Sequence, residues 1–137
     1  DLTNAYLYEV WKPKYDVEAY ITISWVNYTE KGEFHQPHVH SNSAISGVYY
    51  MDTDESDTII YDNPQVNPLT MRVAPSEWNI WNSESWMMPT PKNSVMLFPS
   101  TLRHRVDPTT NPNTRVSLSF NTFLKGKLAS QLSEIVL

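Results

Sequence analysis

The chain of 137 residues is long enough for one domain with a buried core and too short for two domains of ordinary size. Hydrophobic residues make up 40% of it and aromatic residues 12%, proportions typical of a globular protein rather than a disordered one. The net charge of −5 includes no basic run, which argues against nucleic acid as a partner, and no apolar stretch approaches the roughly 20 residues of a membrane-spanning helix.

The chain contains no cysteine, so disulfides are excluded and any metal ion must be held by His or carboxylate side chains. We expect residues 1–137 to form a single domain. The first residue is Asp1 rather than a methionine, which is compatible with the loss of a native N-terminal segment.

Alternation of apolar and polar residues predicts a series of short strands. In chain order, they are expected at residues 17–28, 44–51, 57–61, 69–73, 94–98 and 115–124. Pro and Asn clusters at 63–68, 89–93 and 107–113 predict turns or loops. The segment 76–88 holds three tryptophans and two methionines without a regular period, and we expect a long connection that packs over the strands.

Only the chain ends have a helical character. Near the C-terminus, one face of a helix would collect Leu128, Leu132, Ile135 and Val136. Many short strands at regular spacing, without a long helical period between them, indicate an all-β sandwich or barrel such as a jelly roll.

The densest chemical signal is the sequence Glu-Phe-His-Gln-Pro-His-Val-His at residues 33–40. Side chains at positions i and i+2 of an extended strand point to the same side, so His38 and His40 would project together and could chelate a metal ion. His35 lies three residues before His38 and would face the other side of a straight strand, so it is not included.

A later strand carries a second group of polar residues. His104 follows the strand at 94–98, and Arg115 opens the strand at 115–124. Along that strand Arg115, Ser117 and two further polar residues alternate with apolar ones, as expected for a strand with its polar side facing a pocket. A solvent-facing polar side, or an ion pair between Arg115 and Asp107, is the alternative.

Four segments of the chain resemble a family of 2-oxoglutarate/Fe(II) oxygenases found in bacteria and in phages of marine cyanobacteria. They are Ser-Trp-Val-Asn at 24–27, Pro-His-Val-His at 37–40, Ile-Ser-Gly-Val-Tyr-Tyr at 45–50, and Leu-Phe-Pro-Ser with His104 and the strand from Arg115 to Asn121. The resemblance covers residues 20–124 and implies a double-stranded β-helix, a cupin-like jelly roll with little peripheral helix.

The resemblance also implies the site residues. His38 matches the first metal ligand, His104 the distal ligand, and Arg115 the residue that binds the far carboxylate of 2-oxoglutarate, with Ser117 as an added hydroxyl donor. His40 departs from the pattern, because it stands where the superfamily has a carboxylate ligand. A third imidazole keeps three ligands on one side of the metal but removes one negative charge.

Two other ligand sets stay open at this point. Glu33 or Asp52 could supply a carboxylate while His40 supports the site from outside the metal's coordination sphere. Alternatively, His40 and Asn42 could form the ligand pair, with His38 outside. Three imidazoles also bind zinc or nickel, so the residues alone do not identify iron.

The leading hypothesis is a dioxygenase that uses Fe(II) and 2-oxoglutarate, a small-molecule co-substrate, to hydroxylate an unidentified substrate. The alternatives are a non-catalytic metal-binding module of cupin type and a three-histidine dioxygenase that does not use 2-oxoglutarate. We expect no nucleic-acid or membrane partner and a cytoplasmic location in a bacterium or a phage-infected host, while the oligomeric state stays open.

Overall fold

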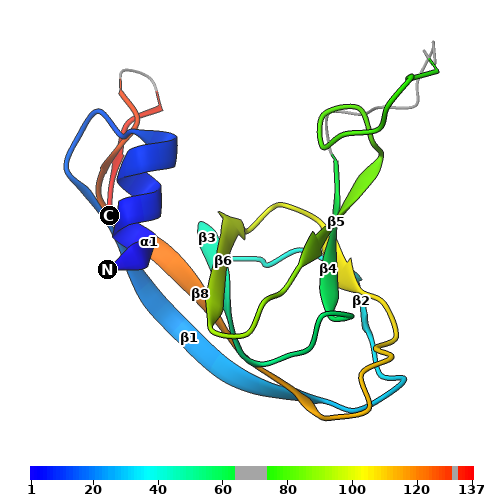
Figure 1. Ribbon diagram of the computed structural model, residues 1–137. Helices are drawn as coiled ribbons and strands as arrows, with labels where there is room; N and C mark the ends of the chain where they lie inside the picture. Colours follow the sequence, from blue (N-terminus) through cyan, green and yellow to red (C-terminus); the bar gives the residue numbers. More distant parts are fainter. Residues whose placement is uncertain (64–73, 131–132) are drawn as a thin grey trace.

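The computed structural model describes residues 1–63, 74–130 and 133–137. Two β-sheets dominate it, and one short helical segment precedes them (Figure 1). In chain order the elements are α1 (Leu2–Tyr6), the π-helical turn η1 (Leu7–Trp11), β1 (Val17–Thr29), β2 (His35–His38), β3 (Ile45–Asp52), β4 (Thr58–Asp62), β5 (Ser85–Pro89), β6 (Ser94–Pro99), β7 (His104–Val106), β8 (Arg115–Leu128) and β9 (Ile135–Val136).

The strands form a larger and a smaller sheet, and most of their pairings join strands that are not consecutive in the chain. The larger sheet has the order β1-β8-β3-β6, with β9 added beside β8, and the smaller one has the order β2-β7-β4-β5. Every pairing is antiparallel. This arrangement of two facing antiparallel sheets is the jelly roll that the sequence predicts, with little helix around it.

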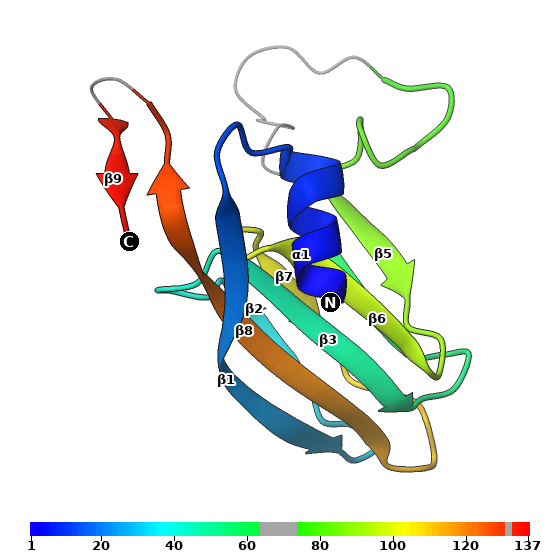
Figure 2. The same ribbon diagram turned by 90° about the vertical axis from the view of Figure 1, so that its left-hand side faces the viewer.

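The N-terminal helical segment covers one part of the larger sheet. Figure 2 shows α1 lying across the outside of that sheet. Leu7 of η1 is almost fully buried there against Val17, Ala19 and Ile45. Asp1 accepts a hydrogen bond from the backbone N–H of Thr3 at 2.9 Å and so caps the helix. A helix this short is not stable alone, so it depends on the packing of Leu7 against the sheet.

Five of the six predicted strands are confirmed with small shifts at their ends, and they correspond to β1, β3, β4, β6 and β8. The prediction for residues 69–73 lies outside the described residues. The predicted connection at 76–88 is wrong at its end, because residues 85–88 belong to β5, which pairs with β4. The alternation of β5 was hidden by its composition, since Met and Trp occupy both sides of the strand.

The predicted C-terminal helix is wrong. β8 extends to Leu128, and Ile135 of β9 pairs with that residue in an antiparallel ladder. A helix-like spacing of apolar residues over so short a segment does not distinguish a helix from a strand, and the edge of β8 offers a backbone partner that a helix would lack. Within the described residues, no helix is long and apolar enough to cross a membrane.

Candidate metal centre

Three histidines meet between the two sheets. His38 ends β2, His104 opens β7, and the two residues pair directly across these strands. His40 follows β2, and its Nε2 lies 3.3 Å from the Nε2 of His104. Possible ligand nitrogens of all three lie within 4.8 Å of one another. Nitrogens bound to one metal ion at about 2.1 Å lie about 3–4 Å apart, so the cluster has the dimensions of a metal site.

Two of the imidazoles are oriented by backbone carbonyl groups. Nδ1 of His38 lies 2.7 Å from the carbonyl oxygen of Gln36, and Nδ1 of His104 lies 2.9 Å from that of Leu102. A carbonyl only accepts, so each Nδ1 carries the proton and each Nε2 keeps a lone pair for a metal ion. Histidine ligands in metal sites commonly have such a partner, which fixes both the tautomer and the ring orientation.

Burial favours the neutral form of His40 and His104, which is the form of histidine that binds metal. Burial lowers the pKa of His104 to about 4, although the carbonyl of Leu102 opposes this effect. Burial also lowers the pKa of His40, and a charge on neighbouring His38 would lower it further. Trp25 and Phe98 pack against the His40 ring, with ring centres 6.1 and 6.4 Å away, and restrict its movement.

His35 lies in the same cavity, so the prediction that it faces the other side of the strand was wrong, although it stays outside the three-histidine cluster. His35 pairs with Val106 and His38 pairs with His104, so three residue steps on β2 match two steps on β7. This bulge adds one residue to β2, which turns His35 to the side that His38 faces. Burial lowers the pKa of His35, and the charges of His38 and Arg115 act in the same direction.

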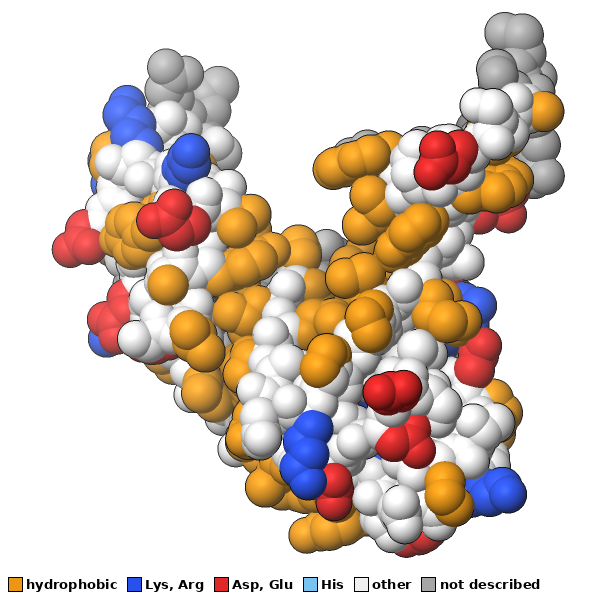
Figure 3. Space-filling model, viewed as in Figure 1, with side chains coloured by type: hydrophobic (Ala, Val, Ile, Leu, Met, Phe, Trp, Pro, Cys, Tyr) orange, Lys and Arg blue, Asp and Glu red, His pale blue; other side chains and the backbone are white. Residues whose placement is uncertain are grey.

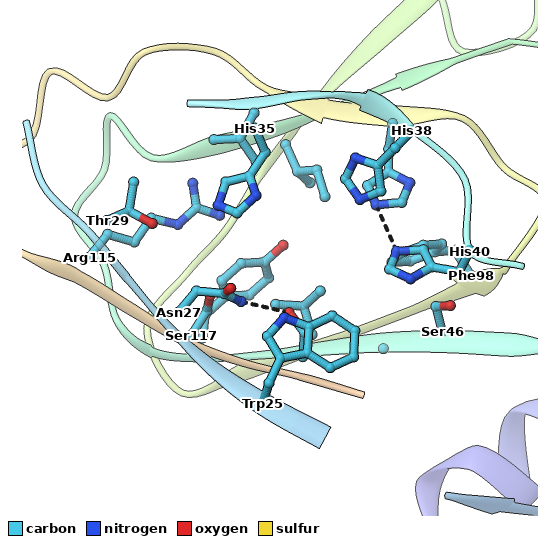
Figure 4. Close-up of a pocket in the computed structure, with 17 residues that line it drawn as sticks. Trp25, Asn27, Thr29, His35, His38, His40, Ser46, Phe98, Arg115 and Ser117 are labelled. Carbon is cyan, nitrogen blue, oxygen red and sulfur yellow. Dashed lines mark hydrogen bonds between the residues drawn. The ribbon is translucent and has the colours of Figure 1, made fainter. Parts of the chain in front are cut away.

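Arg115 lies on the opposite side of the cavity from the histidine cluster (Figure 4). Its side chain is buried, with the residue only 4% exposed, and its guanidinium lies 5.4 Å from the centre of the Tyr50 ring. A long hydrogen bond of 3.4 Å connects it to the carbonyl of Thr58. Among the described residues Arg115 has no carboxylate partner; Asp107, the alternative from the sequence, pairs with Arg105.

The polar side of β8 faces the interior, as predicted. Ser117 and Ser119 are buried and line the cavity together with Arg115. Ser119 accepts a hydrogen bond from Asn27 of β1 at 2.9 Å. The alternative of a solvent-facing polar strand is therefore wrong. Hydroxyl groups and a guanidinium on one wall, with imidazoles on the other, make this cavity suited to an anion that reaches a metal ion.

The other ligand sets considered from the sequence do not assemble here. Asp52 is exposed and forms an ion pair with Lys92 at 2.9 Å. Glu33 is exposed and accepts a hydrogen bond from the backbone N–H of Glu30. Asn42 lies in a turn with φ of +54° and does not line the cavity, whereas His38 does. Within the described residues, no carboxylate joins the histidine cluster.

Tyr50 is a cavity residue that the sequence did not identify. It is fully buried, and its hydroxyl group has no hydrogen-bond partner among the described residues. Burial raises its pKa to about 12, against the opposing effect of Arg115, so the hydroxyl keeps its proton. A buried hydroxyl donor beside a guanidinium that lacks a carboxylate partner fits a bound carboxylate. Tyr49 and Tyr50 are adjacent in β3 and so face opposite sides, but alternation alone does not indicate which one faces inward.

The comparisons with known proteins agree with this geometry. Residues 23–121 match the model of a family described as "Putative 2OG-Fe(II) oxygenase". The crystal structure of an oxidoreductase of the 2OG-Fe(II) oxygenase family from Burkholderia pseudomallei superposes with a TM-score of 0.56 at 18% identity, over 77% of this chain and 45% of that one. None of the curated proteins compared with the chain matches it.

A cupin of RmlC type from Desulfovibrio desulfuricans is also similar, with a TM-score of 0.42 and 11% identity over 78% of this chain and 81% of that one. This chain spans less than half the length of the Burkholderia oxidoreductase. The family match covers most of the sequence and includes the three histidines and Arg115. The chain therefore belongs to this family of 2-oxoglutarate/Fe(II) oxygenases.

Proposed function

We propose that the protein is a dioxygenase that binds Fe(II) through His38, His40 and His104 and uses 2-oxoglutarate to hydroxylate a C–H bond of a second substrate. The observation that supports the proposal is the buried guanidinium of Arg115, which has no carboxylate partner among the described residues and lies in the same cavity as the three-histidine cluster. 2-Oxoglutarate carries a carboxylate at each end, and the cavity offers a cation at one end and candidate metal ligands at the other.

The chain's own residues would position the co-substrate. Arg115 can meet the far carboxylate through two parallel hydrogen bonds, which a lysine cannot reproduce. Ser117 and Tyr50 supply hydroxyl groups on the same wall, and both are buried. Bound Fe(II) would supply the redox chemistry that couples O₂ to oxidation of 2-oxoglutarate to succinate and CO₂. Phe98 packs against His104 and Trp25 against His40, with ring centres 4.8 and 6.1 Å apart, so apolar rings line the histidine side.

Calorimetry tests the proposal directly. Protein loaded anaerobically with Fe(II) should bind 2-oxoglutarate and release succinate after exposure to O₂. The substitution Arg115→Ala should weaken 2-oxoglutarate binding by about 100-fold, since a charge-assisted bidentate contact contributes roughly 1.5–3 kcal/mol or more. Arg103→Ala is the matched control, because the Arg103 side chain is 61% exposed and pairs with Asp62 outside the cavity.

Metal binding without 2-oxoglutarate binding in the wild-type protein would contradict the proposal. It would favour a three-histidine dioxygenase that does not use 2-oxoglutarate, a function supported by His40 at the position of the usual carboxylate. A non-catalytic metal-binding module predicts in addition that Arg115→Ala changes stability alone.

A further inference from the structure

A row of inward-facing side chains leads from the histidine cluster to a second cavity. His38 pairs with His104, His104 pairs with Tyr61, and Tyr61 pairs with Trp86, across β2, β7, β4 and β5. Residues paired directly across an antiparallel sheet point to the same side. With strands about 4.8 Å apart, Trp86 lies about 10 Å from His104 along this row.

The second cavity has a volume of about 350 Å³. It lies between the smaller sheet and β6, and aliphatic, aromatic and thioether groups make up most of its wall: Tyr61, Ile80, Trp81, Trp86, Met88, Met96, Leu97, Phe98, Pro99 and Leu102, with Asp62 and Asn63. Figure 3 shows hydrophobic side chains gathered in the hollow between the N-terminal helix and the segment that leads to β5.

Phe98 and Tyr61 form the boundary between the two cavities. Phe98 lines both of them, and its ring centre lies 4.8 Å from that of His104. The Tyr61 ring lies 5.2 Å from Phe98 and 5.8 Å from His104. A molecule that contacts these two rings from the apolar side is therefore one ring away from a candidate metal ligand.

The apolar cavity contains little that would attract a charge. The carboxylate of Asp62 is compensated by Arg103 at 3.2 Å and Arg105 at 3.1 Å. The Tyr61 hydroxyl donates to the sulfur of Met96 at 2.8 Å. A thioether is a weak acceptor, so a ligand with a better acceptor can take over this bond. Burial raises the pKa of Tyr61, which keeps its hydroxyl protonated as a donor.

We propose that this cavity binds the apolar body of the primary substrate, an uncharged molecule with one or two rings or an aliphatic group of similar size, next to the three-histidine cluster. The inference rests on the proposed function, because it assigns the substrate class of the same centre. A volume of about 350 Å³ lies at the low end of the range of roughly 300–1,000 Å³ for small-ligand sites, and mostly apolar walls with few polar groups are typical of such sites.

The first experiment measures binding of 1-fluoronaphthalene, an uncharged two-ring probe, to the metal-free full chain by ¹⁹F NMR. We expect a Kd on the order of 1 mM or tighter. Met88 lines the cavity, and Met88→Trp should fill it and weaken binding by at least about tenfold. Met87→Trp on the same strand is the matched control, because Met87 is 57% exposed and does not line the cavity.

Absence of binding to the wild-type chain would overturn the proposal. Equal loss of binding in Met87→Trp and Met88→Trp would also overturn it, because it would place the probe elsewhere. Circular dichroism checks that both variants are folded. If Met88→Trp does not fold, the wild-type protein still decides the question through the second experiment.

The second experiment measures the distance between the probe and the metal. Wild-type protein is loaded with Mn(II), whose binding is verified by calorimetry, and Zn(II) serves as the diamagnetic reference. A probe about 10 Å from the histidine cluster should show severalfold faster ¹⁹F relaxation with Mn(II). Binding with unchanged relaxation would overturn the substrate role.

The two hypotheses fail separately. Loss of the 2-oxoglutarate signal in calorimetry with intact probe binding would reject the proposed co-substrate and leave the cavity assignment. Intact 2-oxoglutarate binding without probe binding would reject the apolar substrate class and leave the co-substrate.

Discussion

At the scale of single residues, the contacts that hold Arg115 are all with uncharged groups, so its positive charge has no counterion among the described residues. The carbonyl of Thr58 and the face of the Tyr50 ring are neutral partners. A buried charge without a counterion destabilises the folded state, and proteins retain such a group where a ligand supplies the missing anion. Arg115 should therefore lower the stability of the ligand-free protein, and a bound anion should compensate for this loss.

This reasoning predicts the effect of Arg115→Met on stability. In the absence of ligand the free energy of unfolding should stay equal or rise by roughly 1–3 kcal/mol, because an apolar side chain replaces an uncompensated buried charge. The stabilisation of the metal-loaded protein by added 2-oxoglutarate should disappear. Urea denaturation with and without 2-oxoglutarate measures both effects, and Arg103→Met is the exposed control. A large loss of stability in ligand-free Arg115→Met would show that the guanidinium is structural.

Tyr50 predicts a pH dependence of stability in the alkaline range. Burial raises its pKa in the folded protein to about 12, from about 10 in the unfolded chain. Below pH 10 both states keep the proton, so the contribution to stability is fully present there. Above pH 10 the unfolded chain loses the proton first, and stability falls as the pH rises toward 12.

The variant Tyr50→Phe should remove this part of the pH dependence. Between pH 8 and pH 11 the free energy of unfolding of the wild-type protein should fall by roughly 1 kcal/mol more than that of Tyr50→Phe. Urea denaturation between pH 8 and pH 11 measures it, and Tyr20→Phe on the exposed face of β1 is the control for the substitution itself. An unchanged pH profile in Tyr50→Phe would mean that the hydroxyl is solvated in solution.

At the scale of secondary-structure elements, β3 and β8 approach closely at one pair of residues. Gly47 of β3 pairs with Phe120 of β8, and the Phe120 ring lies over the glycine, where a Cβ atom would overlap it. A glycine in a strand often marks such a close approach. The contact joins the strand of Tyr50 to the strand of Arg115, so it supports one wall of the candidate site.

We expect Gly47→Ala to lower the free energy of unfolding by about 1–3 kcal/mol through overpacking. Combining it with Phe120→Leu should recover part of this loss, since the smaller side chain leaves room for the new methyl group. Chemical denaturation of the two single variants and the double variant gives the interaction energy. Strictly additive effects would show that the ring moves away at no cost.

The bulge in β2 is the other element that shapes the site. It brings His35 and His38 to one side of the strand, although three residue steps separate them. Without the extra residue, His35 would point away from the cavity that it lines with Arg115. A local irregularity in one short strand therefore decides which histidines share the cavity.

At the scale of the whole molecule, a metal ion bound by the cluster would link β2, β7 and the segment after β2. Such an ion binds only the folded chain, since the unfolded chain does not hold the three histidines together, and it should raise stability by about 2.7 kcal/mol at 100 times its Kd. Thermal unfolding with and without Fe(II) under anaerobic conditions measures this. His104→Ala should abolish the metal-dependent rise in Tm.

The control for this experiment is His35→Ala, because His35 lines the cavity but does not belong to the cluster whose nitrogens lie within 4.8 Å of one another. It should keep the metal-dependent rise. An equal rise in wild-type protein and His104→Ala would mean that the ion binds at another place on the chain.

The sequence alone determined the all-β class, most of the strands and the residues worth considering for the site. Alternation in a strand depends on the local backbone geometry, which turns each successive side chain to the opposite side. It therefore predicted that Arg115 and Ser117 share the polar side of β8, and that His38 and His40 project together. The family resemblance added His104 to this set.

Only the tertiary structure decided which of these residues meet. His40 and His104 are 64 residues apart, and their 3.3 Å separation depends on the pairing of β2 with β7. That pairing also contains the bulge that includes His35, while the pairing of β8 with β9 makes the C-terminal segment a strand. The pairings of β4 with β7 and β5 place Trp86 in the row that begins at His38. Periodicity reports the side of a strand that a residue occupies, whereas distances between strands and their register arise from contacts that no local pattern contains.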